Sequence, residues 1–320
     1  MSAEPYPAIR STPALEHLLT LADMPRAQMV ALLDRAQRFS EGRDARQALA
    51  GTAVCTLFFE PSTRTRMSFQ LAALRLGADV LNFDVSTSSA RKGETARDTM
   101  KNLEAMGVRG FIVRHHDDGA VAALADAANP GTALINAGDG RSAHPTQGLL
   151  DMLTLRQAKG ADFSRLKVLV IGDVKHSRVA RSDLHALRTL GHGEGRSIEI
   201  RVCGPQSLLP QDATLDGCLV SQDLDAALEG VDAVMMLRLQ RERMDEGLVA
   251  SLEDYHRDYG LDARRLKRAA ADAVVLHPGP VNRGIEITDE VADGPQSLIL
   301  QQVANGVAVR MAVLEALLAR

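Results

Sequence analysis

Short apolar runs of strand length alternate with stretches of helical periodicity along most of the chain, and this alternation limits the fold more than any other feature. Four runs lie in the first half, at residues 54–59, 80–83, 110–113 and 133–135, and four in the second, at 168–171, 198–202, 233–237 and 273–276. Strands that alternate with helices are joined by crossover connections, which make neighbouring strands parallel and place helices on both faces of the sheet. The sequence therefore predicts an α/β fold with mostly parallel sheets flanked by helices.

A turn-rich stretch at residues 136–145 separates the two groups of strands and predicts a domain boundary. With 320 residues and 45% hydrophobic content, the chain can bury a core large enough for two domains. We expect the first domain at residues 1–145 and the second at 146–297. From about residue 298 to 320, apolar residues fall at helical spacing, which predicts a long amphipathic helix interrupted only by Asn305-Gly306.

The composition excludes several classes of partner. A formal net charge of -4 and an isoelectric point near 6.2 offer no general attraction to nucleic acid or to an anionic membrane. The N-terminal residues show no secretory leader and no stretch approaches membrane-spanning length, so we expect a cytoplasmic protein. The cysteines, which are Cys55, Cys203 and Cys218, lie in or beside apolar runs without metal-ligand spacing, and buried structural thiols are the favoured interpretation.

The strongest candidate for a ligand site is the segment 58–66, which joins an apolar run of strand type to a helical pattern. The first N–H groups of a helix lack intrahelical partners and the helix dipole is positive there, so a phosphate is favoured. Ser62, Thr63 and Thr65 add hydroxyl donors, and Arg64 adds a planar cation that fits phosphate oxygens. One hydroxyl suffices to cap a helix, so this cluster favours an anion site over a solvated cap.

Other polar residues follow the expected strands, where open α/β sheets build their sites. Arg114 directly follows the run 110–113, and Arg238 and Gln240 follow the run 233–237 at a spacing that can place both side chains on one side. A solvated charge run is the alternative interpretation of the latter, and an ordinary surface loop is the alternative for residues 86–95.

Two further segments carry groups suited to acyl chemistry. His144 stands in a turn before a helical pattern, where its imidazole can donate a hydrogen bond to a developing oxyanion. The segment 277–280 (His-Pro-Gly-Pro) ends another run, and rigid turns of this kind present free carbonyl oxygens as acceptors. Gly172 also follows a run, but the GxGxxG pattern of a dinucleotide loop is missing there.

Taken in order, these motifs closely resemble those of the aspartate carbamoyltransferases, in the aspartate/ornithine carbamoyltransferase family. They span nearly the whole chain, at residues 62–65, 92–95, 114–115, 144–147, 178, 238–240 and 277–280. The resemblance implies a carbamoyl-phosphate domain that the C-terminal helix joins, an aspartate domain and a catalytic homotrimer. It also implies carbamoyl transfer from carbamoyl phosphate to L-aspartate, an early step of de novo pyrimidine biosynthesis, with no cofactor and no metal.

The family pattern, carried over residue by residue, gives each motif a role. The residues expected to hold carbamoyl phosphate are Ser62, Thr63, Arg64, Thr65, Arg114, His144, Gln147, Pro278 and Gly279. The residues expected to hold L-aspartate are Lys92, Arg178, Arg238 and Gln240, and Ser88 and Lys92 are expected to reach the site from a neighbouring subunit. The expected catalytic set is Arg64, Thr65, Lys92, Arg114 and His144.

Within this resemblance, the amine of aspartate attacks the carbamoyl carbon directly, so no activated nucleophile of the protein is needed. Thr65, Arg114 and His144 surround the carbamoyl oxygen, on which negative charge grows. Gln147 and the carbonyl groups of residues 278 and 279 hold the carbamoyl amino group. Phosphate then leaves into the turn at residues 62–65, called the cationic turn below.

Two rival functions would require other residues at these positions. Ornithine carbamoyltransferases expect Cys in their His-Pro-Cys-Gln and His-Cys-Leu-Pro motifs and acidic residues for a cationic side chain, whereas this chain has Thr146, Pro278 and Arg238. A noncatalytic phosphate-binding or regulatory homologue would lose Lys92, His144 or Arg114, and this chain keeps all three. The sequence leaves open whether a regulatory or dihydroorotase-like chain binds.

Overall fold

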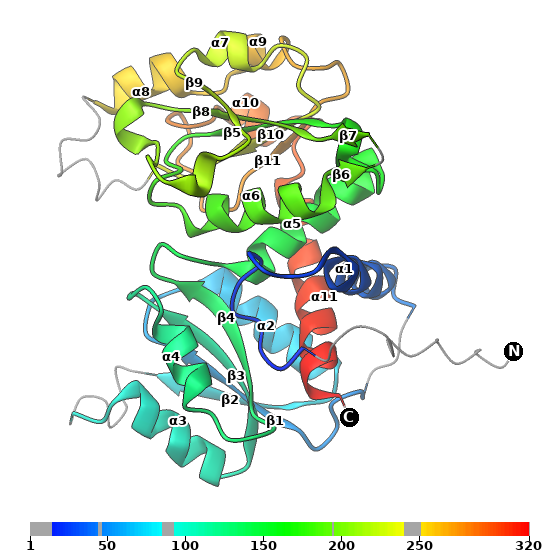
Figure 1. The fold of residues 1–320 in the computed structure, drawn as a ribbon, viewed down its shortest axis with the longest axis vertical. Helices are drawn as coiled ribbons and strands as arrows, with labels where there is room; N and C mark the ends of the chain where they lie inside the picture. The colour runs from blue at the N-terminus through cyan, green and yellow to red at the C-terminus, as the bar shows by residue number, and fades with distance from the viewer. Residues whose placement is uncertain (1–14, 44–46, 85–92, 194, 240–250, 320) are drawn as a thin grey trace, which may run out of the picture.

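The computed structural model describes residues 15–43, 47–84, 93–193, 195–239 and 251–319. Two sheets, each with helices on both faces, lie one above the other in Figure 1, with helices α5 (Pro145–Lys159) and α11 (Ile299–Leu318) at their junction. The predicted α/β class with mostly parallel sheets is confirmed.

The first sheet is parallel and, within the described residues, has the strand order β2-β1-β3-β4. Its strands are β1 (Ala53–Phe58), β2 (Asp79–Asp84), β3 (Val108–His115) and β4 (Ala133–Asp139). Successive side chains of a strand point to opposite faces, and β1 follows this rule. Val54 packs with α1 (Arg26–Ser40), α2 (Thr63–Arg75) and α11 (Ile299–Leu318), whereas Cys55 and Leu57 pack with α3 (Ala96–Ala105) and α4 (Ala120–Asp126).

The second sheet is also parallel, with the order β11-β10-β5-β8-β9 in the described residues. Its strands are β5 (Lys167–Ile171), β8 (Glu199–Cys203), β9 (Leu219–Ser221), β10 (Ala233–Met236) and β11 (Val274–Leu276). The helices α5 (Pro145–Lys159) and α6 (Arg178–Leu190) cover the face that carries Val168 and Val170. The helices α7 (Leu224–Ala227), α9 (Ala263–Leu266) and α10 (Asp289–Ala292) cover the face that carries Leu169 and Ile171.

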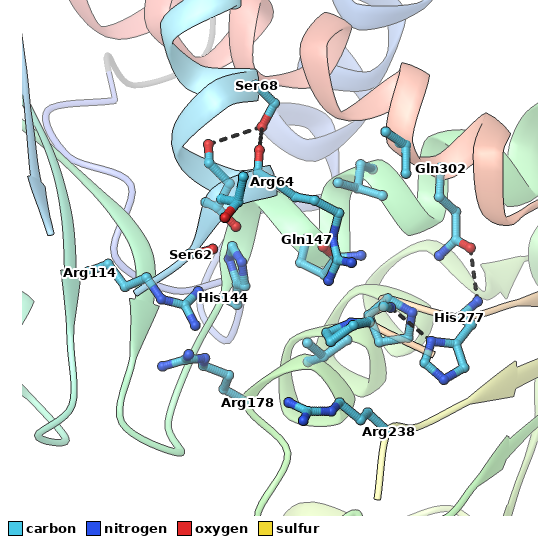
Figure 2. Close-up of a pocket in the computed structure, with 18 of the residues that line it drawn as sticks. Ser62, Arg64, Ser68, Arg114, His144, Gln147, Arg178, Arg238, His277 and Gln302 are labelled. Carbon is cyan, nitrogen blue, oxygen red and sulfur yellow. Dashed lines mark hydrogen bonds between the residues drawn. The ribbon is translucent and has the colours of Figure 1, made fainter. Parts of the chain in front are cut away.

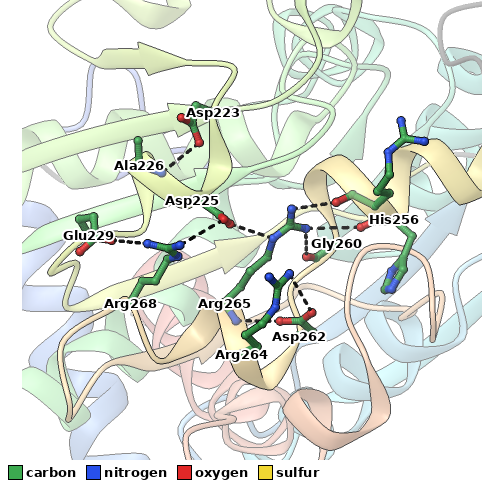
Figure 3. A network of polar contacts seen from close by, with 11 residues as sticks. Asp223, Asp225, Ala226, Glu229, His256, Gly260, Asp262, Arg264, Arg265 and Arg268 are labelled. Carbon is green, nitrogen blue, oxygen red and sulfur yellow. Dashed lines mark hydrogen bonds and ion pairs between the residues drawn. The ribbon is translucent and has the colours of Figure 1, made fainter.

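Short elements complete the second half of the chain. They are the hairpin β6 (His192–Gly193) and β7 (Arg196–Ser197), the helix α8 (Leu252–Tyr259), and the 3₁₀ turns η3 (Phe163–Arg165), η4 (Gln206–Leu208) and η5 (Ala213–Leu215). Figure 3 shows how Arg265 ties three of the small helices together. Its guanidinium pairs with Asp225 of α7 at 3.0 Å and donates to the carbonyl oxygens of Arg257 at 2.7 Å and Gly260 at 2.8 Å.

Helix α11 runs back across the molecule and packs against α1, α2 and α5. The guanidinium of Arg35 on α1 forms an ion pair with Glu315 on α11. The predicted interruption at Asn305-Gly306 is wrong, because the helix is continuous through both residues. The Asn305 side chain donates to the hydroxyl of Thr154 on α5, and a Cβ at Gly306 would lie 2.4 Å from a guanidinium nitrogen of Arg310. These residues therefore serve the packing of α11 instead of ending it.

Within the described residues, no helix combines the length and the hydropathy needed to cross a bilayer.

Candidate active site

A cavity of about 670 Å³ lies where the carboxyl ends of strands from both sheets meet α5 and α11. Eleven of the residues predicted from the sequence line it. They are Ser62, Thr63, Arg64, Thr65, Arg114, His144, Gln147, Arg178, Arg238, Pro278 and Gly279. Ser88, Lys92 and Gln240, the other three predicted residues, lie outside the described residues.

The N-terminus of α2 forms one wall of the cavity. Ser62 occupies the N-cap position in an extended conformation, but its hydroxyl makes no capping hydrogen bond. The Ser68 hydroxyl, one turn into the helix, donates to the carbonyl oxygens of Arg64 at 2.7 Å and Thr65 at 3.0 Å. The first N–H groups of α2 and the Ser62 hydroxyl are therefore available to an anion in the cavity.

Glu60 holds two of the cavity arginines together. The guanidinium of Arg114, just after the buried part of β3, lies 3.0 Å from a Glu60 carboxylate oxygen, and that of Arg178, at the start of α6, lies 2.8 Å from the same oxygen. Arg114 also donates to the Ala137 carbonyl oxygen at 3.2 Å, and Arg178 to the Gly140 carbonyl oxygen at 3.1 Å. One carboxylate thus braces two cations, one from strand β3 and one from helix α6.

The cavity carries more positive than negative charge. Burial and the charge of Arg178 lower the pKa of Arg114 to about 10, and burial and the charge of Arg238 lower the pKa of Arg64. Within the described ranges, no acidic side chain pairs with Arg64 or Arg238. Cations held close together without a balancing acid favour a multiply charged anion as the ligand.

His144 is the N-cap residue of α5 and is almost fully buried. Its backbone N–H donates to the Ser182 hydroxyl at 2.9 Å, while its Nδ1 has no partner among the described residues. Burial, followed by the charges of Arg114 and Arg178, lowers the pKa of His144 well below its usual range. The imidazole is therefore neutral at physiological pH and can donate one hydrogen bond into the cavity.

The turn after β11 brings backbone groups to the opposite wall. The His277 Nδ1 accepts from the Gly279 N–H at 2.8 Å, and its Nε2 lies 3.1 Å from a carboxylate oxygen of buried Glu286. Gly279 has φ +64°, and a Cβ there would lie 2.9 Å from the Arg64 Cζ. The missing side chain thus lets the Arg64 guanidinium rest directly on the turn.

Several cavity residues escaped the sequence reasoning. Glu60 follows strand β1 and stands just before the hydroxyl-rich turn, and this position in the sequence indicates a cavity residue. Gln302 and Arg310 of α11 also line the cavity, but the sequence pattern of this helix indicates only that it is amphipathic.

The end of β3 and the two residues after it hold a compact cluster of potential metal ligands. His115, His116 and Asp117 each offer one ligand atom, and these atoms lie within 4.8 Å of one another. The His115 Nδ1, however, already accepts a hydrogen bond from the Asp117 N–H at 3.0 Å.

Comparison with known proteins establishes the class of this chain. Residues 16–157 match the family model of the aspartate/ornithine carbamoyltransferase carbamoyl-P binding domain, and residues 164–317 match that of the Asp/Orn binding domain. The chain therefore belongs to the aspartate/ornithine carbamoyltransferase family.

Individual members of this family are similar to the chain over nearly its whole length. The chain is 76% identical over 309 residues to the aspartate carbamoyltransferase catalytic subunit of Stenotrophomonas maltophilia K279a, covering 95% of this chain and 96% of the relative. It is 76% identical over 308 residues to the subunit of the same name from Xanthomonas campestris pv. campestris B100, with the same coverage.

Solved structures share the fold. The crystal structure of aspartate transcarbamoylase from Trypanosoma cruzi in complex with carbamoyl aspartate and phosphate is 31% identical with a TM-score of 0.82, covering 95% of this chain and 96% of that one. Ornithine carbamoyltransferase from Thermus thermophilus is 28% identical with a TM-score of 0.84, covering 96% and 100%. The fold is thus shared by enzymes named for two different amino acids, and the site must decide between them.

Proposed function

We propose that this chain is the catalytic chain of an aspartate carbamoyltransferase. It transfers the carbamoyl group of carbamoyl phosphate to L-aspartate, giving N-carbamoyl-L-aspartate and phosphate, an early step of de novo pyrimidine biosynthesis. The observation that carries the choice of amino acid is the pair Arg178 and Arg238, which line the cavity beside the cationic turn. Two guanidinium groups suit the two carboxylates of aspartate, whereas the ammonium of ornithine would require an acidic partner. The relatives at 76% identity support the same choice.

We assign residues 1–145 to the carbamoyl-phosphate domain, which the helix at about 298–320 joins, and residues 146–297 to the aspartate domain. The packing of α11 against α1 and α2 supports the return of the last helix to the first domain.

Carbamoyl phosphate lies with its phosphate on the turn 62–65 and on Arg114. This placement is supported by the unused N–H groups of α2 and by the unpaired charge of Arg64. The carbamoyl oxygen lies toward Thr65, Arg114 and neutral His144, and the amino group toward Gln147 and the carbonyl groups of Pro278 and Gly279. Arg178 holds the α-carboxylate of aspartate, while Arg238 and Gln240 hold its β-carboxylate.

Transfer begins when the neutral amine of aspartate adds its lone pair to the carbamoyl carbon. The carbonyl electrons move onto oxygen, where the Arg114 cation and the His144 donor stabilise the charge. The C–O bond to phosphate then breaks and the carbonyl re-forms. Glu60 is engaged by two arginines and Asp173 by His176, so the departing phosphate takes the amine proton.

The family resemblance further supports a homotrimer in which Ser88 and Lys92 of one subunit complete the site of the next. The trimer, a larger assembly with regulatory or dihydroorotase-like chains, and the cytoplasmic location stay predictions.

Binding of N-(phosphonacetyl)-L-aspartate tests this site. A Trypanosoma cruzi aspartate transcarbamoylase has been solved in complex with this compound, which joins a phosphonate to two carboxylates. By calorimetry, the wild-type chain should bind it, and Arg238→Leu should weaken binding about 10- to 100-fold, the effect of one lost charged hydrogen bond. Arg268→Ala removes an arginine that pairs with Asp225 and Glu229, as Figure 3 shows. Arg268 is not among the described residues that line the cavity, so this change should leave binding unchanged. Equal binding by wild-type and Arg238→Leu proteins would overturn the assignment.

A further inference from the structure

Asp151 of α5 is a buried carboxylate that hydrogen-bonds to two glutamines lining the cavity. Its Oδ1 accepts from the Gln147 Nε2 at 3.0 Å and from the Gln302 Nε2 at 2.6 Å. The Gln302 Oε1 in turn accepts from the backbone N–H of His277 at 2.9 Å. Figure 2 shows Gln147, Gln302 and His277 around the same side of the cavity. Asp151 therefore lies between a cavity amide and the turn after β11.

The charge of Asp151 fixes the orientation of both amides. An ionised carboxylate can only accept hydrogen bonds, so Gln147 and Gln302 must each turn their NH₂ groups toward it. The Gln147 amide oxygen is then the atom left for a ligand, since its NH₂ group donates to both oxygens of Asp151, at 3.0 and 3.2 Å. For Gln302, the same rule leaves its oxygen to hold the N–H of His277.

Burial raises the pKa of Asp151 to about 6, and two neighbours favour its ionised form at neutral pH. Asp183 of α6 is buried and hydrogen-bonded to Asp151, and burial together with the Asp151 charge raises the pKa of Asp183 well above its usual range. Asp183 therefore keeps its proton, and its O–H donates a hydrogen bond to the Asp151 carboxylate. Arg310 of α11, whose pKa is lowered by burial to about 10, remains charged at neutral pH and balances the Asp151 carboxylate. The pair of acids thus carries one negative charge beside one positive charge.

We propose that Asp151 is a positioning residue that sets the Gln147 amide oxygen and the 277–279 turn as joint acceptors, and so selects a ligand carrying an NH₂ group over the same ligand carrying a methyl group. The inference rests on the proposed function, in which that ligand is carbamoyl phosphate. Acetyl phosphate has nearly the same shape but no N–H donor, and is the matched probe.

Replacing Asp151 by Asn tests the proposal, because one face of an asparagine amide donates and the other accepts. The Gln147 Nε2 donates to both carboxylate oxygens, at 3.0 and 3.2 Å, so whichever oxygen the asparagine NH₂ replaces, one of these hydrogen bonds is lost and two donors face each other. The KM for carbamoyl phosphate should rise about tenfold, the effect of one lost or misdirected hydrogen bond, while the Ki of acetyl phosphate should change less than about twofold. The ratio of KM to Ki is the measured quantity.

Thr154→Val is the control for a purely structural role. It removes the hydroxyl that accepts from Asn305 at 2.9 Å, a link between the same two helices that touches neither Gln147 nor the cavity. It should lower the thermal midpoint but leave the ratio unchanged. If Asp151→Asn does not fold, Gln302→Met is the test variant. It removes the hydrogen bonds that connect Asp151 to the backbone N–H of His277, and it should raise the ratio of KM to Ki severalfold.

Each outcome has a separate meaning. An unchanged ratio in a folded Asp151→Asn protein, or in Gln302→Met where the first does not fold, overturns the positioning role alone. An equal change in the ratio for Thr154→Val overturns it as well, because helix packing would then account for the effect. Absence of carbamoyl transfer by the wild-type chain overturns the proposed function and this inference with it.

Discussion

Replacing Gly279 by Ala perturbs the closest contact between the two walls of the cavity. The residue has φ +64°, and a Cβ would lie 2.9 Å from both Cζ and Nη1 of Arg64 and 3.0 Å from its Nη2. Carbon contacts are comfortable at about 3.5–4.0 Å, so the guanidinium must move by roughly 0.5–1 Å. Misplacement of a substrate-positioning group by about 1 Å can cost about a hundredfold in rate. We therefore expect kcat/KM for carbamoyl phosphate to fall about 10- to 100-fold.

The same substitution also strains the backbone, so its effect on stability must be separated from its effect on Arg64. A non-glycine residue in the left-handed region costs roughly 1–2 kcal/mol. Gly284→Ala is the matched control, because Gly284 has φ +75° and a Cβ there would meet no atom within 4 Å. Thermal midpoints should fall by similar amounts in both variants, while steady-state assays should show lost activity in Gly279→Ala alone. Wild-type kcat/KM in Gly279→Ala, or an equal loss in Gly284→Ala, would refute the reasoning.

Three further predictions concern His144 and the neighbouring subunit. His144→Ala should lower turnover about a hundredfold or more while phosphate binding measured by calorimetry is kept, since the donor matters most in the transition state; an unchanged kcat would remove it from the mechanism. The folded-state pKa of His144 lies well below 6.5, so the unfolded chain binds more protons than the folded chain once the pH falls below about 6.5. The free energy of unfolding should therefore decrease as the pH is lowered from about 6.5 to 5. In urea titrations over this range, His144→Gln should make this decrease smaller. Lys92→Ala and His144→Ala proteins, each inactive alone, should regain activity when they are dissociated and reassociated together. The reason is that each mixed trimer of the proposed assembly contains one intact site. If hybrids verified by chromatography are inactive, Lys92 does not complete the site of a neighbouring subunit.

Sequence periodicity was enough to predict the α/β class, because buried parallel strands leave continuous apolar runs between helical patterns. Strand β9 was missed, since it has three residues and its Leu219 and Val220 are exposed, so no buried run marks it. The interruption at Asn305-Gly306 was predicted from intrinsic propensity, and the contacts of Asn305 with α5 override that propensity.

The cavity residues that follow strands could be predicted, because an arginine or a hydroxyl cluster directly after an apolar run stands out in the sequence. Asp151 and Asp183 could not be recognised in the same way. Each lies within a helical pattern, where an acidic residue normally faces solvent, and the contact between α5 and α6 that brings the two together is tertiary.

A competition between two amine substrates tests the central claim most directly. The purified chain is given carbamoyl phosphate with equal concentrations of L-aspartate and L-ornithine, without added metal, and the carbamoylated products are separated and identified by mass spectrometry. Because Arg178 and Arg238 both line the cavity and are proposed to hold the two carboxylates of aspartate, N-carbamoyl-L-aspartate should be the dominant product. Preferential formation of citrulline, the carbamoylated form of ornithine, would contradict the account.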